Sequence, residues 1–125
     1  MTQILMVGAG GFLGAVGRYL LTGLVQRWTP LAVLPFGTLT VNVVGCLVIG
    51  FLGGVSAAHG ILVGRSREFL FIGVLGGFTT FSSFALETLT LVKGGETGGG
   101  IANVLLHVFC CLAAVWLGSM VSRAV

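Results

Sequence analysis

Long apolar stretches separated by short polar ones dominate the pattern of this chain. Four of the stretches are long enough to cross a bilayer, which takes about 20 residues as a helix. We expect these spans at residues 3–25, 33–58, 69–92 and 101–122, with turns at 28–30 and 94–100 and a central loop at 59–68. The pattern predicts an all-α membrane protein with four transmembrane helices, in which residues 1–125 form a single transmembrane domain.

The third apolar stretch contains a polar segment at residues 76–84, GGFTTFSSF. Lipid tails offer no hydrogen-bond partner to unpaired backbone groups or unpaired hydroxyls, so placing such a segment within a transmembrane helix costs free energy. We therefore expect the third helix to break at Gly76 and Gly77. Backbone carbonyls freed by a break can coordinate an alkali cation. An ordinary glycine kink is the alternative.

Composition agrees with a membrane protein and excludes several functions. Only 7% of the residues are charged, whereas a soluble domain carries about a quarter. There is no basic cluster to bind nucleic acid, and no hydrolase triad, phosphate-binding loop or metal cluster, so we do not expect an enzyme. The three cysteines, Cys46, Cys110 and Cys111, have no metal-ligand spacing and are expected to be buried in the membrane as small hydrophobes.

The few charges give almost no orientation signal. The side of the termini and the central loop holds three arginines and the opposite side two cations: Arg65, Arg67 and Arg123 against Arg27 and Lys93. Without a positive-inside bias a chain can insert both ways round, which would permit an antiparallel homodimer. The alternative is that Arg65 and Arg67 alone fix the central loop in the cytoplasm.

Phe81 and Phe84 are candidates for contact with an anion. They are three residues apart and share a helix face, and the positive edge of an aromatic ring attracts anions without carrying a charge. The alternative is simple packing against lipid or core. The neighbouring hydroxyls, among them Thr80 and Ser82, favour a polar site. Ser and Thr hydroxyls often bond only to the backbone of their own helix, but four of them rarely occur for that purpose within six residues.

Three further polar residues lie in the first and second spans. Thr38 and Asn42 are four residues apart on one face, and the amide of Asn42 can either donate to an anion or form an interhelical hydrogen bond. Arg18 can line an aqueous vestibule that attracts anions, or its side chain can snorkel to the membrane surface.

Three motifs together resemble the CrcB/Fluc family of small fluoride channels: GGFLGA at 10–15 followed by Arg18 and Tyr19, GTLTVN at 37–42, and GGFTTFSSF at 76–84 with Glu87. The resemblance covers nearly the whole chain. It implies a dual-topology, antiparallel homodimer in the inner membrane with two fluoride pores. Such a channel exports cytoplasmic fluoride passively and so lowers its toxicity.

The resemblance also implies roles for individual residues. The pore phenylalanines fall on Phe81 and Phe84, the pore asparagine on Asn42, and a hydroxyl of the polar track on Thr38. We assign Thr80 and Ser82 to the fluoride pore as further hydroxyl donors.

The vestibule arginine of the family falls on Arg18. A structural sodium ion, which is not transported, would be held by the backbone carbonyls of Gly76 and Thr79 from each subunit. The chain departs from the family pattern at Cys110-Cys111, where relatives usually have Gly-Ser, and at Val115, where threonine is frequent.

Two other functions stay open on the residues alone. A small proton-coupled exporter of organic cations needs a membrane-embedded carboxylate, and Glu87 is the only acid within a predicted span. A membrane scaffold subunit without transport activity is the second alternative.

Overall fold

The computed structural model describes residues 1–30 and 33–124, and no strand occurs among them. Four helical stretches are long and apolar enough to cross a membrane: Thr2–Trp28, Phe36–His59, Arg65–Lys93 and Thr97–Ala124. The first is α1 (Thr2–Trp28), the second α2 (Phe36–His59), and the fourth α6 (Thr97–Val121) followed by the 3-10 turn η2 (Ser122–Ala124). The prediction of an all-helical chain with four long apolar helices is confirmed.

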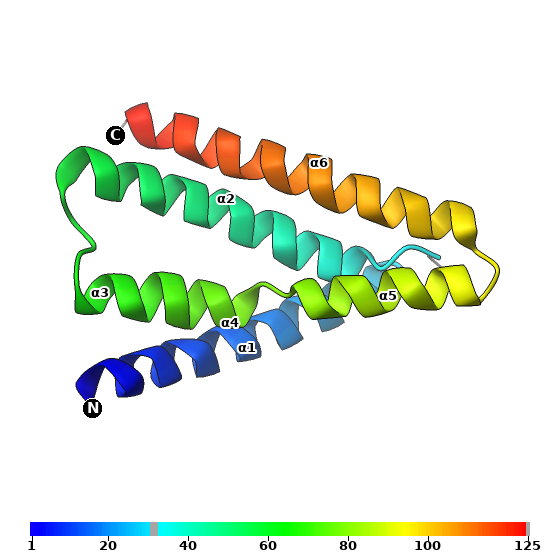
Figure 1. Ribbon diagram of the computed structural model, residues 1–125, viewed down its shortest axis with the longest axis horizontal. Coiled ribbons are helices and arrows are strands. Elements are labelled where there is room, and N and C mark those ends of the chain that lie inside the picture. Colours follow the sequence, from blue (N-terminus) through cyan, green and yellow to red (C-terminus); the bar gives the residue numbers. More distant parts are fainter. Residues whose placement is uncertain (31–32, 125) are drawn as a thin grey trace.

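Both termini and the loop after α2 lie at the same end of the bundle, and the turn between α5 and α6 lies at the other (Figure 1). Glycines in the left-handed region make the connections. Gly60, with φ 63°, follows the last residue of α2, and Gly95, with φ 88°, lies in the turn before α6. Because these φ values favour glycine, the sequence fixes where two of the spans end.

The third stretch is assembled from several helical pieces. It begins with α3 (Arg65–Arg67), widens into the π-helix η1 (Glu68–Leu75), and continues through α4 (Gly76–Phe78) and α5 (Phe81–Lys93). Between α4 and α5, Thr79 (φ −79°, ψ 155°) and Thr80 (φ −150°, ψ 114°) have extended backbone. Neither the π-helix nor the start of the helix at Arg65 was expected from the sequence.

Glycines set the distance between the helices. A Cβ on Gly10 would come within 2.9 Å of the Cα of Gly73, and one on Gly77 within 2.6 Å of the carbonyl oxygen of Gly11. The backbones of α1 and of the η1–α4 segment therefore touch without side chains between them. On the other side of the bundle, α2 packs along α6, where Gly50 and Gly118 allow the same close approach.

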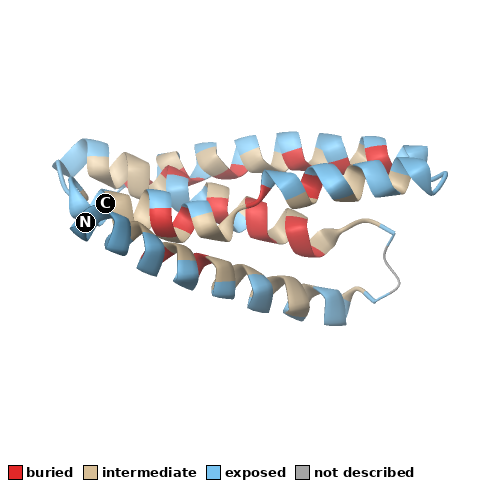
Figure 2. Ribbon diagram, turned by 60° about the horizontal axis from the view of Figure 1, so that its bottom comes forward, coloured by how far each residue is buried: buried red, intermediate tan, exposed pale blue. Residues whose placement is uncertain are grey.

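The bundle is apolar outside and partly polar inside, the reverse of a soluble domain. Large apolar side chains such as Phe12, Leu20 and Trp116 are exposed, and buried positions are confined to the lines where helices meet (Figure 2). Six polar residues are buried: Thr38, Asn42, Thr80, Asn103, His107 and Ser122. This inversion suits a chain whose outer surface faces lipid tails.

The side chain of Asn42 supplies hydrogen bonds to the extended backbone between α4 and α5. Its Nδ2 donates to the carbonyl oxygen of Thr80 at 3.0 Å, and the Thr80 N–H donates to its Oδ1 at 2.8 Å. Extended residues leave the helical hydrogen-bond ladder, and an unpaired backbone group in an apolar environment costs several kcal/mol. The paired bonds, which we call the Asn42 clamp, therefore stabilise the connection between α4 and α5 from the neighbouring helix α2.

Replacing Asn42 by Leu, whose side chain has the same number and branching of heavy atoms, should destabilise the protein in detergent by about 2–4 kcal/mol, because two buried backbone groups of Thr80 lose their partners. Thermal or denaturant unfolding followed by circular dichroism measures the loss. Thr40→Ala, on the same helix and outside the clamp, is the matched control. An Asn42→Leu protein as stable as the control variant would contradict the role given to the clamp.

Candidate functional site

The amino end of α5 gathers the hydroxyls of the polar segment. Thr80 caps this helix, because its Oγ1 accepts a hydrogen bond from the N–H of Ser83 at 3.2 Å. The same Oγ1 lies 3.0 Å from the Ser83 Oγ and 3.3 Å from the Ser82 Oγ. The amino end of a helix carries a partial positive charge and attracts anions, and the three hydroxyls are gathered at this end of α5.

Phe81 and Phe84 lie on the first turn of α5, beside these hydroxyls. Their ring centroids are 5.2 Å apart and the rings are tilted by 60°, so each ring presents an edge to its surroundings. Phe84 is 9% exposed, whereas Phe81 is 78% exposed in the single chain. The pair therefore extends from the interior of the bundle to its outer face.

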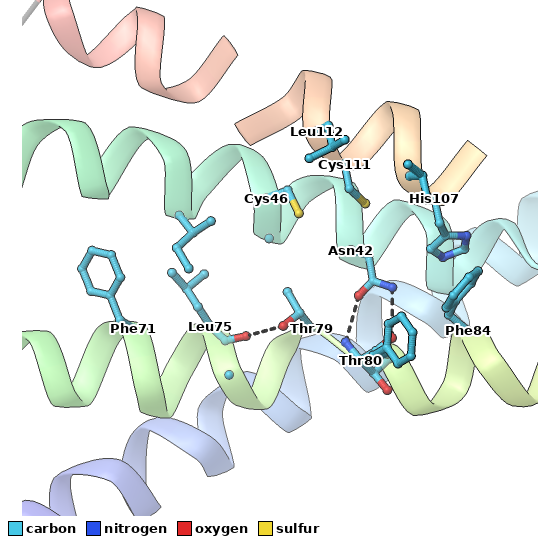
Figure 3. A pocket seen from close by; sticks show the side chains of 15 residues that line it. Asn42, Cys46, Phe71, Leu75, Thr79, Thr80, Phe84, His107, Cys111 and Leu112 are labelled. Carbon is cyan, nitrogen blue, oxygen red and sulfur yellow. Dashed lines mark hydrogen bonds between the residues drawn. The ribbon is translucent and has the colours of Figure 1, made fainter. Parts of the chain in front are cut away.

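A hollow lies on each side of Thr80. One, which we call the central groove, has a volume of about 500 Å³ and is lined by α2, η1, α5 and α6; Figure 3 shows Asn42, Phe84 and His107 on its wall. The other, the Arg18 pocket, has a volume of about 750 Å³ and opens beside α1. Thr80 lines both hollows and Ser83 lines the Arg18 pocket, so Thr80 stands where the two hollows adjoin.

The structure divides the predicted site residues between these two hollows. Asn42, Phe81 and Phe84 line the central groove, together with Gly76 and Thr79. Arg18 and Thr38 line the Arg18 pocket. Ser82 is joined to the hydroxyl cluster through Thr80.

Thr38 is paired with an acid inside the Arg18 pocket. Its Oγ1 donates a hydrogen bond of 2.5 Å to the Oε1 of Glu87, and Glu87 also lines the pocket. The second carboxylate oxygen of Glu87 is buried and has no partner. Arg18, Thr38 and Glu87 thus place one cation, one hydroxyl and one carboxylate around the same hollow.

The two residues expected to offer carbonyls lie on the wall of the central groove. The extended conformation of Thr79 takes its carbonyl oxygen out of the helical ladder, where the Nη1 of Arg18 approaches it at 3.5 Å. The Thr79 hydroxyl instead donates to the Leu75 carbonyl oxygen at 3.0 Å. Backbone carbonyls are ligands that hard cations accept, and in this chain an alkali ion would take the Thr79 carbonyl in place of the Arg18 hydrogen bond.

The sequence interpretation assigned no role to Asn103 and His107, which support Phe84. The Asn103 Nδ2 donates to the Thr88 Oγ1 at 2.8 Å, and the Thr88 Oγ1 donates to the Phe84 carbonyl oxygen at 2.8 Å. The His107 ring lies 4.4 Å from the Phe84 ring, centroid to centroid. The signal in the sequence was the spacing of four residues between Asn103 and His107 in an otherwise apolar helix.

Residues 5–119 match the family model described as CrcB-like protein, Camphor Resistance (CrcB). A protein of Opitutus terrae named "Fluoride-specific ion channel FluC" is 49% identical over 120 residues, covering 94% of this chain and 90% of the relative. Proteins with the same name are 43% identical in a Sulfurovum species (96% and 93% covered) and 45% identical in Methylocella silvestris (97% and 93% covered). The chain therefore belongs to the CrcB family of multi-pass membrane proteins.

Proposed function

We propose that this chain forms a fluoride-selective channel that exports cytoplasmic fluoride passively across the inner membrane. The observation that carries the proposal is the position of the amino end of α5, where the hydroxyls of Thr80, Ser82 and Ser83 adjoin Phe81 and Phe84. The names of the relatives, each a fluoride-specific ion channel, point to the same ion.

The proposed route runs from the Arg18 pocket past Thr80 to the central groove. Fluoride is small and strongly hydrated, so the protein must replace lost water with hydrogen-bond donors and positive ring edges. Hydroxyls and the helix end supply these without a fixed charge in the central groove, which would hold the anion too tightly for release. Asn42 is a further donor, because its amide has two N–H groups and the clamp uses one of them.

A passive route is sufficient for export. Fluoride enters an acid-exposed cell as neutral hydrogen fluoride, dissociates inside and is trapped as the anion. A negative-inside potential favours its exit by about 2.3 kcal/mol per 100 mV. The alternative of a proton-coupled exporter is less well supported, since Glu87, the acid that it would need, already accepts the Thr38 hydroxyl and the relatives carry a channel name.

We also propose that two copies assemble in opposite orientations. In each copy, the extended residues Thr79 and Thr80 would form the break in the third transmembrane helix. The support is the exposed part of the site: Phe81, which lines the central groove, is 78% exposed in the single chain. An anion in the groove would be open to lipid tails on this side unless protein covered it. A second copy would supply that cover.

A structural sodium ion is the proposed cofactor of this dimer. The carbonyls of Gly76 and Thr79 would bind it, two from each subunit, and its charge would hold the two broken spans together. The groups that fit it are the Thr79 carbonyl, which the extended backbone turns out of the helix, and Gly76 on the same groove wall.

Phe81→Ile and Phe84→Ile should each reduce fluoride efflux from liposomes by about tenfold, because losing one ring edge removes roughly 1.4 kcal/mol of anion stabilisation. A fluoride electrode measures the efflux. Phe109→Ile, which changes an exposed ring of α6, is the control and should keep wild-type flux. Wild-type flux in both test variants would remove the role proposed for the rings.

The orientation of the chain can be tested with Val63→Cys, which places an accessible thiol in the exposed loop between α2 and α3. In sealed vesicles, a membrane-impermeant maleimide should label about half of this thiol from outside, because an unbiased chain inserts both ways. Permeabilised vesicles give the total, and the wild-type chain gives the background of the native cysteines. Labelling of all or none from outside would rule out dual topology.

Replacing sodium by a large organic cation at constant ionic strength should lower both the unfolding temperature of the dimer and the fluoride flux, since a ligand that binds only the folded state stabilises it. Lithium or potassium at the same concentration provides the comparison for ion size. Equal stability and flux in sodium and in the organic cation would contradict the structural ion.

A further inference from the structure

Helices α2 and α6 run side by side in the same direction (Figure 1), and their glycines fix how the residues align. A Cβ on Gly50 would lie 2.9 Å from the carbonyl carbon of Val115, and one on Gly54 would lie 3.6 Å from the carbonyl oxygen of Ser119. The alignment thus advances by one turn, four residues, on both helices together. One turn before these contacts, the same alignment pairs Cys46 with Cys111.

The two thiols of this pair share one hollow. Both residues line the central groove, and Figure 3 shows Cys46 on α2 and Cys111 on α6 among the side chains that line it. All three cysteines are free. Cys110 is not among the residues that line the groove, because adjacent residues on a helix point in different directions.

We propose that Cys46 and Cys111 form a binding site for a soft cation that prefers two sulfur ligands in a line, such as Hg²⁺, Ag⁺ or Cu⁺. Thiolate sulfur selects soft metals over hard ones. No group of three or more His, Cys, Asp or Glu residues suited to a metal occurs in the described part of the chain, which argues against the four-ligand geometry that structural zinc requires. Two facing thiols satisfy a linear ion completely.

The charge balance suits an apolar environment. When Hg²⁺ binds, two S–H bonds break, two Hg–S bonds form, and both protons pass to water. The product carries no net charge, so its burial avoids the cost of placing an ion in a medium of low dielectric constant. With Ag⁺ or Cu⁺, one thiol loses its proton and the second binds through its lone pair, and the complex is again neutral.

His107 lies on the wall of the same groove, one helical turn before Cys111. It does not join the two thiols as a third ligand, because no group of three such residues suited to a metal occurs among the described residues. Its Nδ1 is instead 3.0 Å from the Asn103 carbonyl oxygen, and its ring packs against Phe84. The proposed site therefore consists of the two sulfur atoms alone.

The test counts thiols in the purified full-length protein after reduction and removal of the reductant. One equivalent of Hg²⁺ is added, the remaining free thiols are alkylated with a maleimide, and mass spectrometry with peptide mapping identifies which cysteines were protected. We expect the wild-type chain to lose two reactive thiols, Cys46 and Cys111, and to keep Cys110. Cys110→Ser is the matched control and should also lose two.

In Cys46→Ser and in Cys111→Ser, one equivalent of Hg²⁺ should protect only one thiol from alkylation, because the second sulfur of the pair is missing. The proposal is overturned if the wild-type chain loses a single thiol, if Cys110 is one of the two protected residues, or if Cys46→Ser still loses two. The peptide map of the wild-type chain decides without any variant, so poor folding of a variant does not obscure the result. The readout is also independent of fluoride transport.

Discussion

The backbone of Thr79 and Thr80 must find hydrogen-bond partners in a place where water is scarce, and the rest of the site depends on how this requirement is met. Asn42 on α2 supplies both partners for the Thr80 backbone, and the Thr80 side chain caps the helix that follows. The glycine contacts of α1 with η1 and α4 hold the preceding piece in position. A connection that would be unstable in lipid alone is thereby stabilised by two neighbouring helices.

The same arrangement links the fold to anion transport. Because α5 starts inside the bundle, its capping residue Thr80 lines both the Arg18 pocket and the central groove, and Ser83 lines the pocket. The charged side chains Arg18 and Glu87 line the Arg18 pocket and not the central groove, so on the proposed route the anion would meet neutral dipoles beside Thr80. Such dipoles can replace the water around fluoride and still release it, which a fixed cation at that point would hinder.

The sequence predicted the parts of this structure that follow from local chemistry. Apolar runs of membrane length gave the four long helices, and the spacing of Phe81 and Phe84 gave their common face. For Asn42 the sequence left open whether the side-chain amide bonds to an anion or to another helix, because the hydrogen-bond partner of an amide depends on how the helices pack. The pairing of Cys46 with Cys111 follows from the alignment of the parallel helices α2 and α6, which glycine contacts set. The support of Phe84 by Asn103 follows from the packing of α6 against the antiparallel α5. The periodicity of the sequence reports neither.

The most direct test of the account is ion efflux from liposomes that contain only this protein. With a potassium gradient and valinomycin to carry the balancing charge, a fluoride electrode and a chloride electrode record the two anions in parallel. We expect rapid loss of fluoride and chloride loss no faster than from protein-free liposomes, since the neutral donors around Thr80 match the smaller ion. Equal loss of both anions, or no fluoride loss from well-folded protein, would contradict the claim that this site selects and conducts fluoride.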